Sequence, residues 1–172
     1  DEDGDLDIVT RFNDGSNVIT WFENNGSESF TGNSIDNIQA GNIEVIDLDE
    51  DGDYDLVVPD RTNDYLVWYA NNGSESFTKN TIDNSGMTDI YDVEVGDIDG
   101  DGIPDLVLIV PTLTPGEIQI YLGKDYANWT SSPSLIMTST ELNNAGASHM
   151  PNMVSINGDL DGDGFDDLVI GT

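Results

Sequence analysis

Short apolar runs separated by Gly, Asn, Asp and Ser dominate the pattern of hydrophobic and polar positions along this chain. The pattern is most complete in four successive runs, IEVIDL (43–48), DLVVPD (55–60), YLVWYA (65–70) and SFTKNTI (76–82). Runs of this length and β-branched or aromatic content, bounded by turn residues, are typical of β-strands. YLVWYA is apolar on both faces, which predicts a strand buried on both sides. No helix is predicted, and segment 138–148 is expected to be a loop with at most one helical turn.

The same pattern recurs along the chain, so the sequence is built from internal repeats. The matching positions of successive acidic runs lie 48, 50 and 62 residues apart. These runs are DEDGDLDIV (1–9), DLDEDGDYDLVV (47–58), DIDGDGIPDLVL (97–108) and DLDGDGFDDLVI (159–170). A second element, WFENNGSESFTGNSIDN (21–37), matches WYANNGSESFTKNTIDN (68–84) at 13 of 17 positions. Segment 120–135 takes its place in the third unit, with Trp129 replacing Phe30 and Phe77.

Repeated units of four short strands and about 50 residues are typical of β-propeller blades. We therefore predict an all-β fold of four-stranded antiparallel blades in a single repeat domain, 1–172. The expected parts are a partial blade (1–37), two blades (41–84 and 91–140) and a half blade (153–172). This amounts to about three and a quarter blades, fewer than a closed propeller needs. Two interpretations stay open, namely a piece of a longer propeller and a chain completed head to tail by strand addition from other copies.

The strongly negative net charge of the chain limits which molecules it can bind. The formal net charge is −31, and the only basic residues are Arg11, Arg61, Lys79 and Lys124. Such a chain is a poor ligand for nucleic acid or for an anionic membrane, and no stretch is long and apolar enough to span a bilayer. It has no cysteine, which excludes disulfides and thiolate metal sites. The compact apolar runs argue against a disordered acidic chain.

The acidic residues are concentrated rather than spread. Aspartate outnumbers glutamate 26 to 9, and 18 of the 26 aspartates lie in the four acidic runs. A halophilic surface would spread both residue types over the whole chain, so this clustering requires a local cause. The three complete runs share the pattern D-x-D-x-D-G-x-x-D, in which the carboxylates at positions 1, 3, 5 and 9 can converge on one point. The glycine at position 6 allows a sharp turn, and position 7 can add a backbone carbonyl oxygen.

A shell of several carboxylates and other oxygen ligands suits Ca²⁺ better than Mg²⁺, which requires a tight octahedron and keeps its waters. We expect three to four Ca²⁺ ions. The first run is truncated, because its Asp1, Asp3 and Asp7 match positions 3, 5 and 9, and Asp5 matches position 7. The other predicted ligands are Asp47, Asp49, Asp51, Asp53 and Asp55, then Asp97, Asp99, Asp101, Ile103 and Asp105, then Asp159, Asp161, Asp163, Phe165 and Asp167. Position 7 (Asp53, Ile103, Phe165) would contribute its main-chain oxygen.

Two other interpretations of the acidic runs are weaker. An EF-hand also begins D-x-D-x-D-G, but it needs a bidentate Glu at position 12 and flanking helices. Position 12 here is Val58, Leu108 or Ile170, each inside a predicted strand, and a dockerin fails for the same reason. An unliganded acidic turn would explain one run, but it does not explain several copies that all have glycine at the same position.

These runs resemble the FG-GAP/VCBS repeats, the calcium-loop repeats of integrin α-subunit propellers and of many bacterial and archaeal surface proteins. The matching segments are VIDLDEDGDYDLVV (45–58), VGDIDGDGIPDLVLI (95–109), NGDLDGDGFDDLVIGT (157–172) and WYANNGSESF (68–77). The resemblance implies propeller blades with Ca²⁺ bound between the first and second strands. It also implies an extracellular or cell-surface location.

The expected function is therefore an extracellular calcium-binding repeat module with a structural or adhesive role, self-assembling or part of a larger protein. Its partners would be Ca²⁺, further copies, surface proteins or glycans. The alternative is a glycan-binding or accessory domain of a secreted enzyme. We expect no enzyme activity, because the single histidine, His149, accompanies no nucleophile motif. The repeated Trp21 and Trp68 predict core packing, and Asn25, Asn72 and Asn128 head glycosylation sequons.

Overall fold

The fold consists almost entirely of antiparallel β-sheet. The computed structural model describes residues 3–12, 14–74, 76–90, 92–111, 116–123, 129, 132–138, 140–141, 153–156 and 158–171. Their thirteen strands form four sheets, each made of strands that follow one another in the chain. The predicted all-β class with antiparallel strands is thus confirmed.

The first two sheets cover the N-terminal half. Sheet A has the order β1-β2-β3, and sheet B has the order β4-β5-β6-β7. The strands of sheet A are β1 (Ile8–Arg11), β2 (Val18–Asn24) and β3 (Phe30–Asn37). Those of sheet B are β4 (Glu44–Ile46), β5 (Asp55–Asp60), β6 (Tyr65–Asn71) and β7 (Phe77–Asp83). Sheet B therefore contains a first strand, β4, that has no counterpart among the described residues of sheet A.

The last two sheets repeat this order. Sheet C runs β8-β9-β10-β11, and sheet D pairs β12 with β13. Their strands are β8 (Val93–Gly96), β9 (Asp105–Val110), β10 (Glu117–Tyr121), β11 (Leu135–Thr138), β12 (Met153–Ile156) and β13 (Leu168–Gly171). In segment 138–148, residues 140–141 are helical and most of the rest lies outside the described residues.

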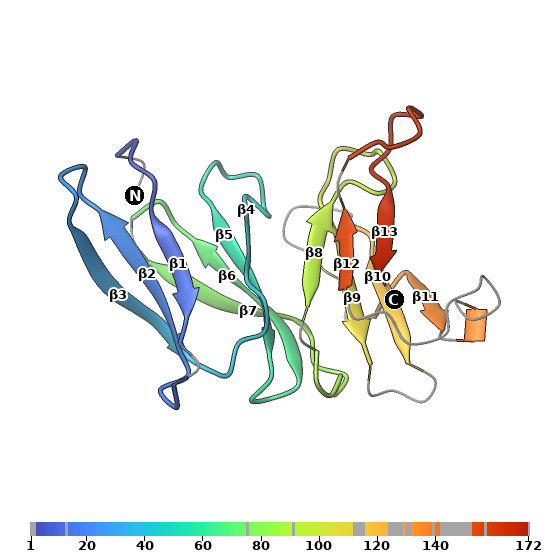
Figure 1. The fold of residues 1–172 in the computed structure, drawn as a ribbon, viewed down its shortest axis with the longest axis horizontal. Coiled ribbons are helices and arrows are strands. Elements are labelled where there is room, and N and C mark those ends of the chain that lie inside the picture. The colour runs from blue at the N-terminus through green and yellow to red at the C-terminus, as the bar shows by residue number, and fades with distance from the viewer. Residues whose placement is uncertain are drawn as a thin grey trace.

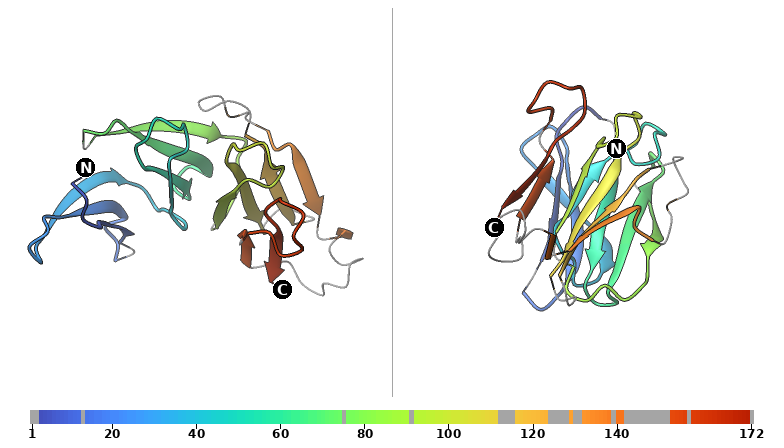
Figure 2. Two further views of the ribbon diagram at one scale, coloured as in Figure 1. Left: turned by 90° about the horizontal axis from the view of Figure 1, so that it is seen from above. Right: turned by 90° about the vertical axis from the view of Figure 1, so that its right-hand side faces the viewer.

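Sheets A, B and C follow one another in Figure 1, where sheet D overlaps sheet C, and the view from above in Figure 2 shows the sheets along an open arc. A cluster of apolar side chains packs at each of the three junctions between successive sheets. The central strands are the most buried, and every residue of β5 and of β9 is buried. The predicted double-sided burial of 65–70 holds for Leu66–Tyr69. Among the described residues, no helix has the length and apolar character that crossing a membrane requires.

Candidate metal centre

Each acidic run forms a loop at the same place in its sheet. Loop 2 (47–54) joins β4 to β5, loop 3 (97–104) joins β8 to β9, and loop 4 (159–167) joins β12 to β13. The described part of loop 1 (3–7) leads into β1. In loop 2 the strand pairing brings Ile46 opposite Asp55, so the two ends of the loop are held together. Loop 3 closes in the same way, with Gly96 opposite Asp105.

The aspartate at position 9 ties its loop to a neighbouring hairpin. Asp55 accepts hydrogen bonds from the backbone N–H groups of Leu48 (3.1 Å) and Asn71 (2.8 Å). Asp105 accepts two matching bonds, both of 2.8 Å, from Ile98 in loop 3 and from Gly123 after β10. Both carboxylates are fully buried. This side chain therefore fixes the loop against the end of the third strand of its sheet.

The glycine at position 6 has a second role beyond its turn. Its backbone N–H donates a hydrogen bond to the aspartate at position 1, which folds the loop back toward its own start. These bonds run from Gly52 to Asp47 (3.1 Å), from Gly102 to Asp97 (2.9 Å) and from Gly164 to Asp159 (2.8 Å). The φ angles of these glycines are 104°, 86° and 97°, a region that side chains disfavour. This geometry explains why each of the three loops has glycine at position 6.

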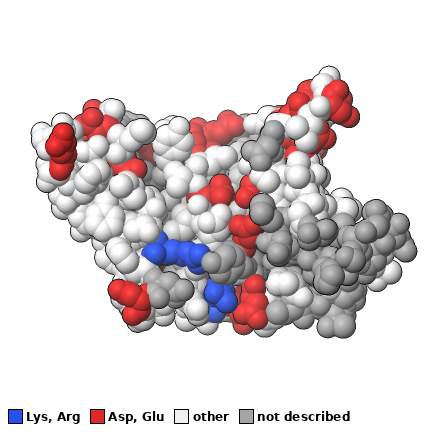
Figure 3. Space-filling view, in the orientation of Figure 1, with Lys and Arg blue, Asp and Glu red and all other residues white. Residues whose placement is uncertain are grey.

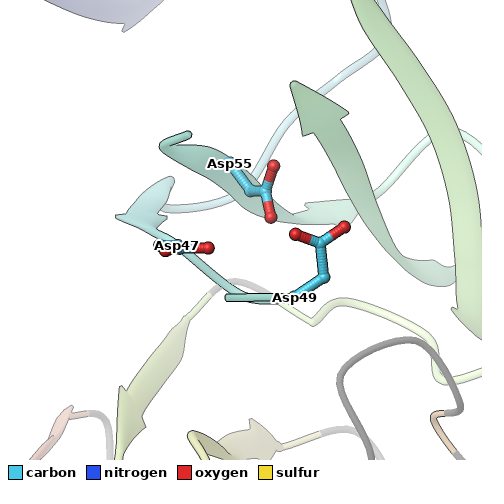
Figure 4. A group of neighbouring side chains, drawn as sticks. All are labelled: Asp47, Asp49 and Asp55. Atoms are coloured by element: carbon cyan, nitrogen blue, oxygen red, sulfur yellow. The ribbon is translucent and has the colours of Figure 1, made fainter. Parts of the chain in front are cut away.

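Carboxylate oxygens converge in each of loops 2, 3 and 4. In each loop, one oxygen from each of three aspartates lies within 4.8 Å of the other two. The three groups are Asp47, Asp49 and Asp55 (Figure 4), then Asp97, Asp99 and Asp101, then Asp159, Asp161 and Asp167. Asp51, Asp105 and Asp163 lie in the same loops but outside these groups. Among the described residues of loop 1, Asp3, Asp5 and Asp7 form no such group, and Asp1 lies outside the described residues.

The comparison with family models matches the FG-GAP-like repeat at residues 1–58 and again at 47–108. The chain belongs to the FG-GAP repeat family. The two matches include loops 1, 2 and 3, and together they cover more than half of the chain. The comparison with curated proteins gave no significant match.

Buried charge is found in loop 2 and at Asp105 of loop 3, whereas Asp159 in loop 4 is exposed and backbone hydrogen bonds lower its pKa. Burial, followed by the charges of Asp49 and Asp51, raises the pKa of Asp55 to about 6. Burial and Asp51 raise the pKa of Asp49, and burial raises that of Asp105. Among the described residues, Oδ1 of Asp47 is buried without a hydrogen-bond partner. A buried anionic oxygen without a donor is costly, so this oxygen of Asp47 in loop 2 fits a cation.

The donor set indicates the kind of cation. The three groups found among the described residues consist of aspartates, whose carboxylate oxygens are ligands of hard cations such as Ca²⁺. Asp47, Asp49 and Asp55 would hold the ion in loop 2, and the corresponding groups would hold it in loops 3 and 4. The residues present therefore fit a calcium ion.

The side chains at position 7 lie against glycines. A Cβ atom added to Gly73 would lie 2.6 Å from the carboxylate of Asp53, and one added to Gly123 would lie 2.6 Å from Ile103. Phe165 lies against Gly100 of the preceding loop. Sequence reasoning assigned these positions only a main-chain oxygen and did not foresee these side-chain contacts. Loop 2 in fact packs directly on the hairpin turn at Asn72-Gly73.

The remaining candidate residues have local roles. Trp21 and Trp68 are only 6% and 7% exposed, so their faces are not open to a sugar. The amide oxygens of Asn25 and Asn72 accept hydrogen bonds of 3.0 Å from Ser27 and Ser74, within exposed turns. His149, Lys124 and Asn128 lie outside the described residues.

Proposed function

We propose that this chain is a calcium-binding repeat module of the β-propeller type, with a structural or adhesive role in an extracellular protein. The observation that carries the proposal is the recurrence of one carboxylate group at the same junction between first and second strands in three sheets. Membership of the FG-GAP family supports the extracellular setting, since these repeats are typical of extracellular proteins. No catalytic role is part of the proposal.

Calcium would stabilise the sheets by way of the loops. Loops 2, 3 and 4 each join the first two strands of their sheet. In sheets B and C the position 9 aspartate also holds the end of the third strand. Without a cation, several carboxylates lie within a few ångströms of one another and repel. A ligand that binds the folded chain and not the unfolded chain adds to the free energy of unfolding. The ion would therefore make the stiffness of the module depend on the surrounding calcium concentration.

A calcium titration of the metal-stripped chain by calorimetry, followed by thermal unfolding with EDTA or CaCl₂, tests the proposal. We expect saturable binding of at least three ions, one for each of loops 2, 3 and 4, and a higher melting temperature in calcium. Asp97→Asn should remove one ion from the stoichiometry. Asp64→Asn is the matched control, because Asp64 lies in the β5–β6 turn and has a positive φ that asparagine tolerates.

Two results would contradict the proposal. The first is an absence of calcium binding. The second is stabilisation by high NaCl equal to that by millimolar CaCl₂, which would instead indicate a halophilic acidic surface.

A further inference from the structure

Two hairpin turns of the molecule contain the same Asn-Gly pair. The pair at 25–26 lies in the turn between β2 and β3, and the pair at 72–73 lies in the turn between β6 and β7. Both residues of each pair are exposed. The two glycines have φ angles of 69° and 64°, so the backbone has a similar conformation at both. The two pairs are therefore open to solvent in the same setting.

An Asn-Gly pair can react with itself. The backbone nitrogen of the glycine can attack Cγ of the asparagine, because glycine has no Cβ atom to hinder the approach. In the turn after β6, the backbone N–H of Ser74 donates a hydrogen bond of 3.0 Å to Oδ1 of Asn72, which draws electron density away from Cγ. The N–H of Gly73 donates to Oδ1 of Asn71 (3.3 Å), so the attacking nitrogen already shares its proton with an acceptor. Both contacts favour the attack.

The turn after β2 has the same two hydrogen bonds. The backbone N–H of Ser27 donates to Oδ1 of Asn25 at 3.0 Å, and that of Gly26 donates to Oδ1 of Asn24 at 3.1 Å. Sheet C lacks the reactive pair, because the corresponding segment 122–131 contains no Asn-Gly. The arrangement therefore belongs to the turns of sheets A and B.

We propose that Asn25 and Asn72 are sites of deamidation through a cyclic imide. The glycine nitrogen forms a bond to Cγ and loses its proton, while the bond between Cγ and Nδ2 breaks and the amide group leaves as ammonia. Water then adds to one of the two carbonyl carbons of the ring and opens it, which gives aspartate or isoaspartate. The reaction needs no oxidant or reductant, and each event adds one negative charge to the chain.

Loop 2 packs on one of the turns that would react. A Cβ atom added to Gly73 would lie 2.6 Å from the carboxylate of Asp53, and the N–H of Asn71 donates a 2.8 Å hydrogen bond to Asp55. Isoaspartate at position 72 would lengthen the main chain by a methylene group between these two contacts. It should therefore move the turn away from loop 2 and weaken calcium binding there. This effect rests on the proposed function, whereas the deamidation itself does not.

The turn in sheet A lies against loop 1 in the same way. A Cβ atom added to Gly26 would overlap the carboxylate of Asp5, and the N–H of Asn24 donates at 2.8 Å to Asp7. Figure 3 shows the acidic residues mainly along the upper rim of the molecule, where the loops lie. Because both turns pack on loops, each deamidation adds its charge to this already acidic end.

Incubation of the full chain in a mildly alkaline buffer with EDTA, followed by peptide mass spectrometry, tests the proposal. We expect conversion at Asn25 and Asn72 to be at least about tenfold faster than at Asn42, which is also exposed but precedes the β-branched Ile43. The rate should rise with pH, because the attacking nitrogen must lose its proton. Enzymatic methylation of isoaspartate identifies that product.

Calcium calorimetry then tests the effect on loop 2. The aged natural chain should bind fewer ions than an equally aged Asn72→Gln chain, by the fraction of chains that carry isoaspartate at position 72. Glutamine forms the corresponding ring far more slowly, so this comparison isolates position 72 from the other Asn-Gly pairs. Asn72→Asp adds the charge without lengthening the main chain, and it should bind as many ions as the fresh natural chain.

Conversion at Asn25 and Asn72 that is no faster than at Asn42 would overturn the inference, because the hydrogen bonds would then hold each turn away from the geometry of attack. If both sites convert but the aged natural chain binds as many ions as the aged Asn72→Gln chain, the deamidation sites stand and their effect on loop 2 is refuted. If the fresh chain binds no calcium, the proposed function fails, and mass spectrometry still decides the deamidation sites.

Discussion

The hydroxyl group of Tyr69 in β6 donates a hydrogen bond of 2.7 Å to Oδ2 of Asp36 in β3, and so joins sheet B to sheet A. The next junction repeats this contact, because the hydroxyl group of Tyr121 donates at 2.7 Å to Asp83. Both tyrosines are almost fully buried. The sheets are thus joined by a repeated polar contact as well as by apolar packing.

Replacement of either tyrosine by phenylalanine should destabilise the chain. Tyr121→Phe leaves the buried Asp83 without its hydroxyl donor and should lower the free energy of unfolding by about 1–3 kcal/mol, as for a lost hydrogen bond to a charged group. Tyr69→Phe should cost less, because Lys79 also contacts Asp36, at 3.1 Å. Urea unfolding measures both values. Tyr54→Phe, at a 68% exposed tyrosine, is the control and should change little.

The first sheet supplies a natural comparison for this contact. The residue matching Tyr69 is Phe22, which packs edge-on against Phe12 with ring centroids 6.2 Å apart. Since sheet A has no described sheet before it, Phe22→Tyr should add no stability. If Phe22→Tyr raised the free energy of unfolding by as much as Tyr121→Phe lowers it, the hydroxyl group would stabilise the chain without an aspartate opposite it. The hydrogen bond between tyrosine and aspartate would then not explain how the sheets are joined.

Gly73 should tolerate a methyl group less well than another glycine with the same backbone conformation. Gly73 and Gly86 have φ angles of 64° and 84°, so alanine carries a similar backbone cost at both positions. A Cβ atom at Gly73 would lie 2.6 Å from the carboxylate of Asp53, whereas nothing lies within 4 Å of one at Gly86. Thermal unfolding should therefore show a larger loss for Gly73→Ala than for Gly86→Ala. Equal losses would mean that loop 2 moves away from the hairpin turn at no cost.

Glu44 predicts a pH dependence outside the loops. Burial, followed by the charges of Glu94 and Asp92, raises the pKa of Glu44 to about 7 from its ordinary value of 4.5. The folded chain therefore binds the proton more tightly than the unfolded chain does, and stability should rise as the pH falls from about 7 toward 4.5. Glu44→Gln should flatten this rise and stabilise the chain at pH 8, as measured by urea unfolding in EDTA. Glu28→Gln, at an exposed turn residue, should leave the slope as it is in the natural chain.

The parts of the structure that depend on neighbouring residues could be predicted from the sequence. The alternation of apolar runs and turns predicted a strand at 55–60, the bounds that β5 has in the structure, and the repeated D-x-D-x-D-G pattern predicted where the carboxylate groups lie. What could not be predicted depends on partners far apart in the chain. Asp36 and Tyr69 are separated by 33 positions, and nothing in either residue alone indicates the other.

The carboxylate groups themselves show the same limit. The pattern treats positions 1, 3, 5 and 9 as equal ligands, but Asp105 lies outside the group of loop 3. Its two oxygens accept hydrogen bonds from the backbone of Ile98 and Gly123. The hydrogen bonds between tyrosine and aspartate that join the sheets did leave one signal in the sequence. An aspartate recurs near the end of the last strand of sheets A and B, in SIDN (34–37) of β3 and TIDN (81–84) at the end of β7.

Asp47 provides the sharpest test of the metal centre, because removal of its charge should have opposite effects with and without calcium. Its Oδ2 accepts the hydrogen bond from Gly52, and its buried Oδ1 has no donor among the described residues. Asp47→Asn keeps an acceptor for Gly52 and removes one of three close negative charges. In EDTA the variant should be as stable as the natural chain or more stable, by up to about 1 kcal/mol.

In CaCl₂ the order should reverse, because the variant loses an anionic ligand and with it part of the stabilisation that calcium provides. Thermal unfolding of both chains in the two buffers measures the crossover, and Asp64→Asn should show none. A variant that is less stable by the same amount in both buffers would mean that Asp47 has only a structural role in the turn. The repulsion between the loop carboxylates would then be too weak to explain why the chain concentrates its aspartates there.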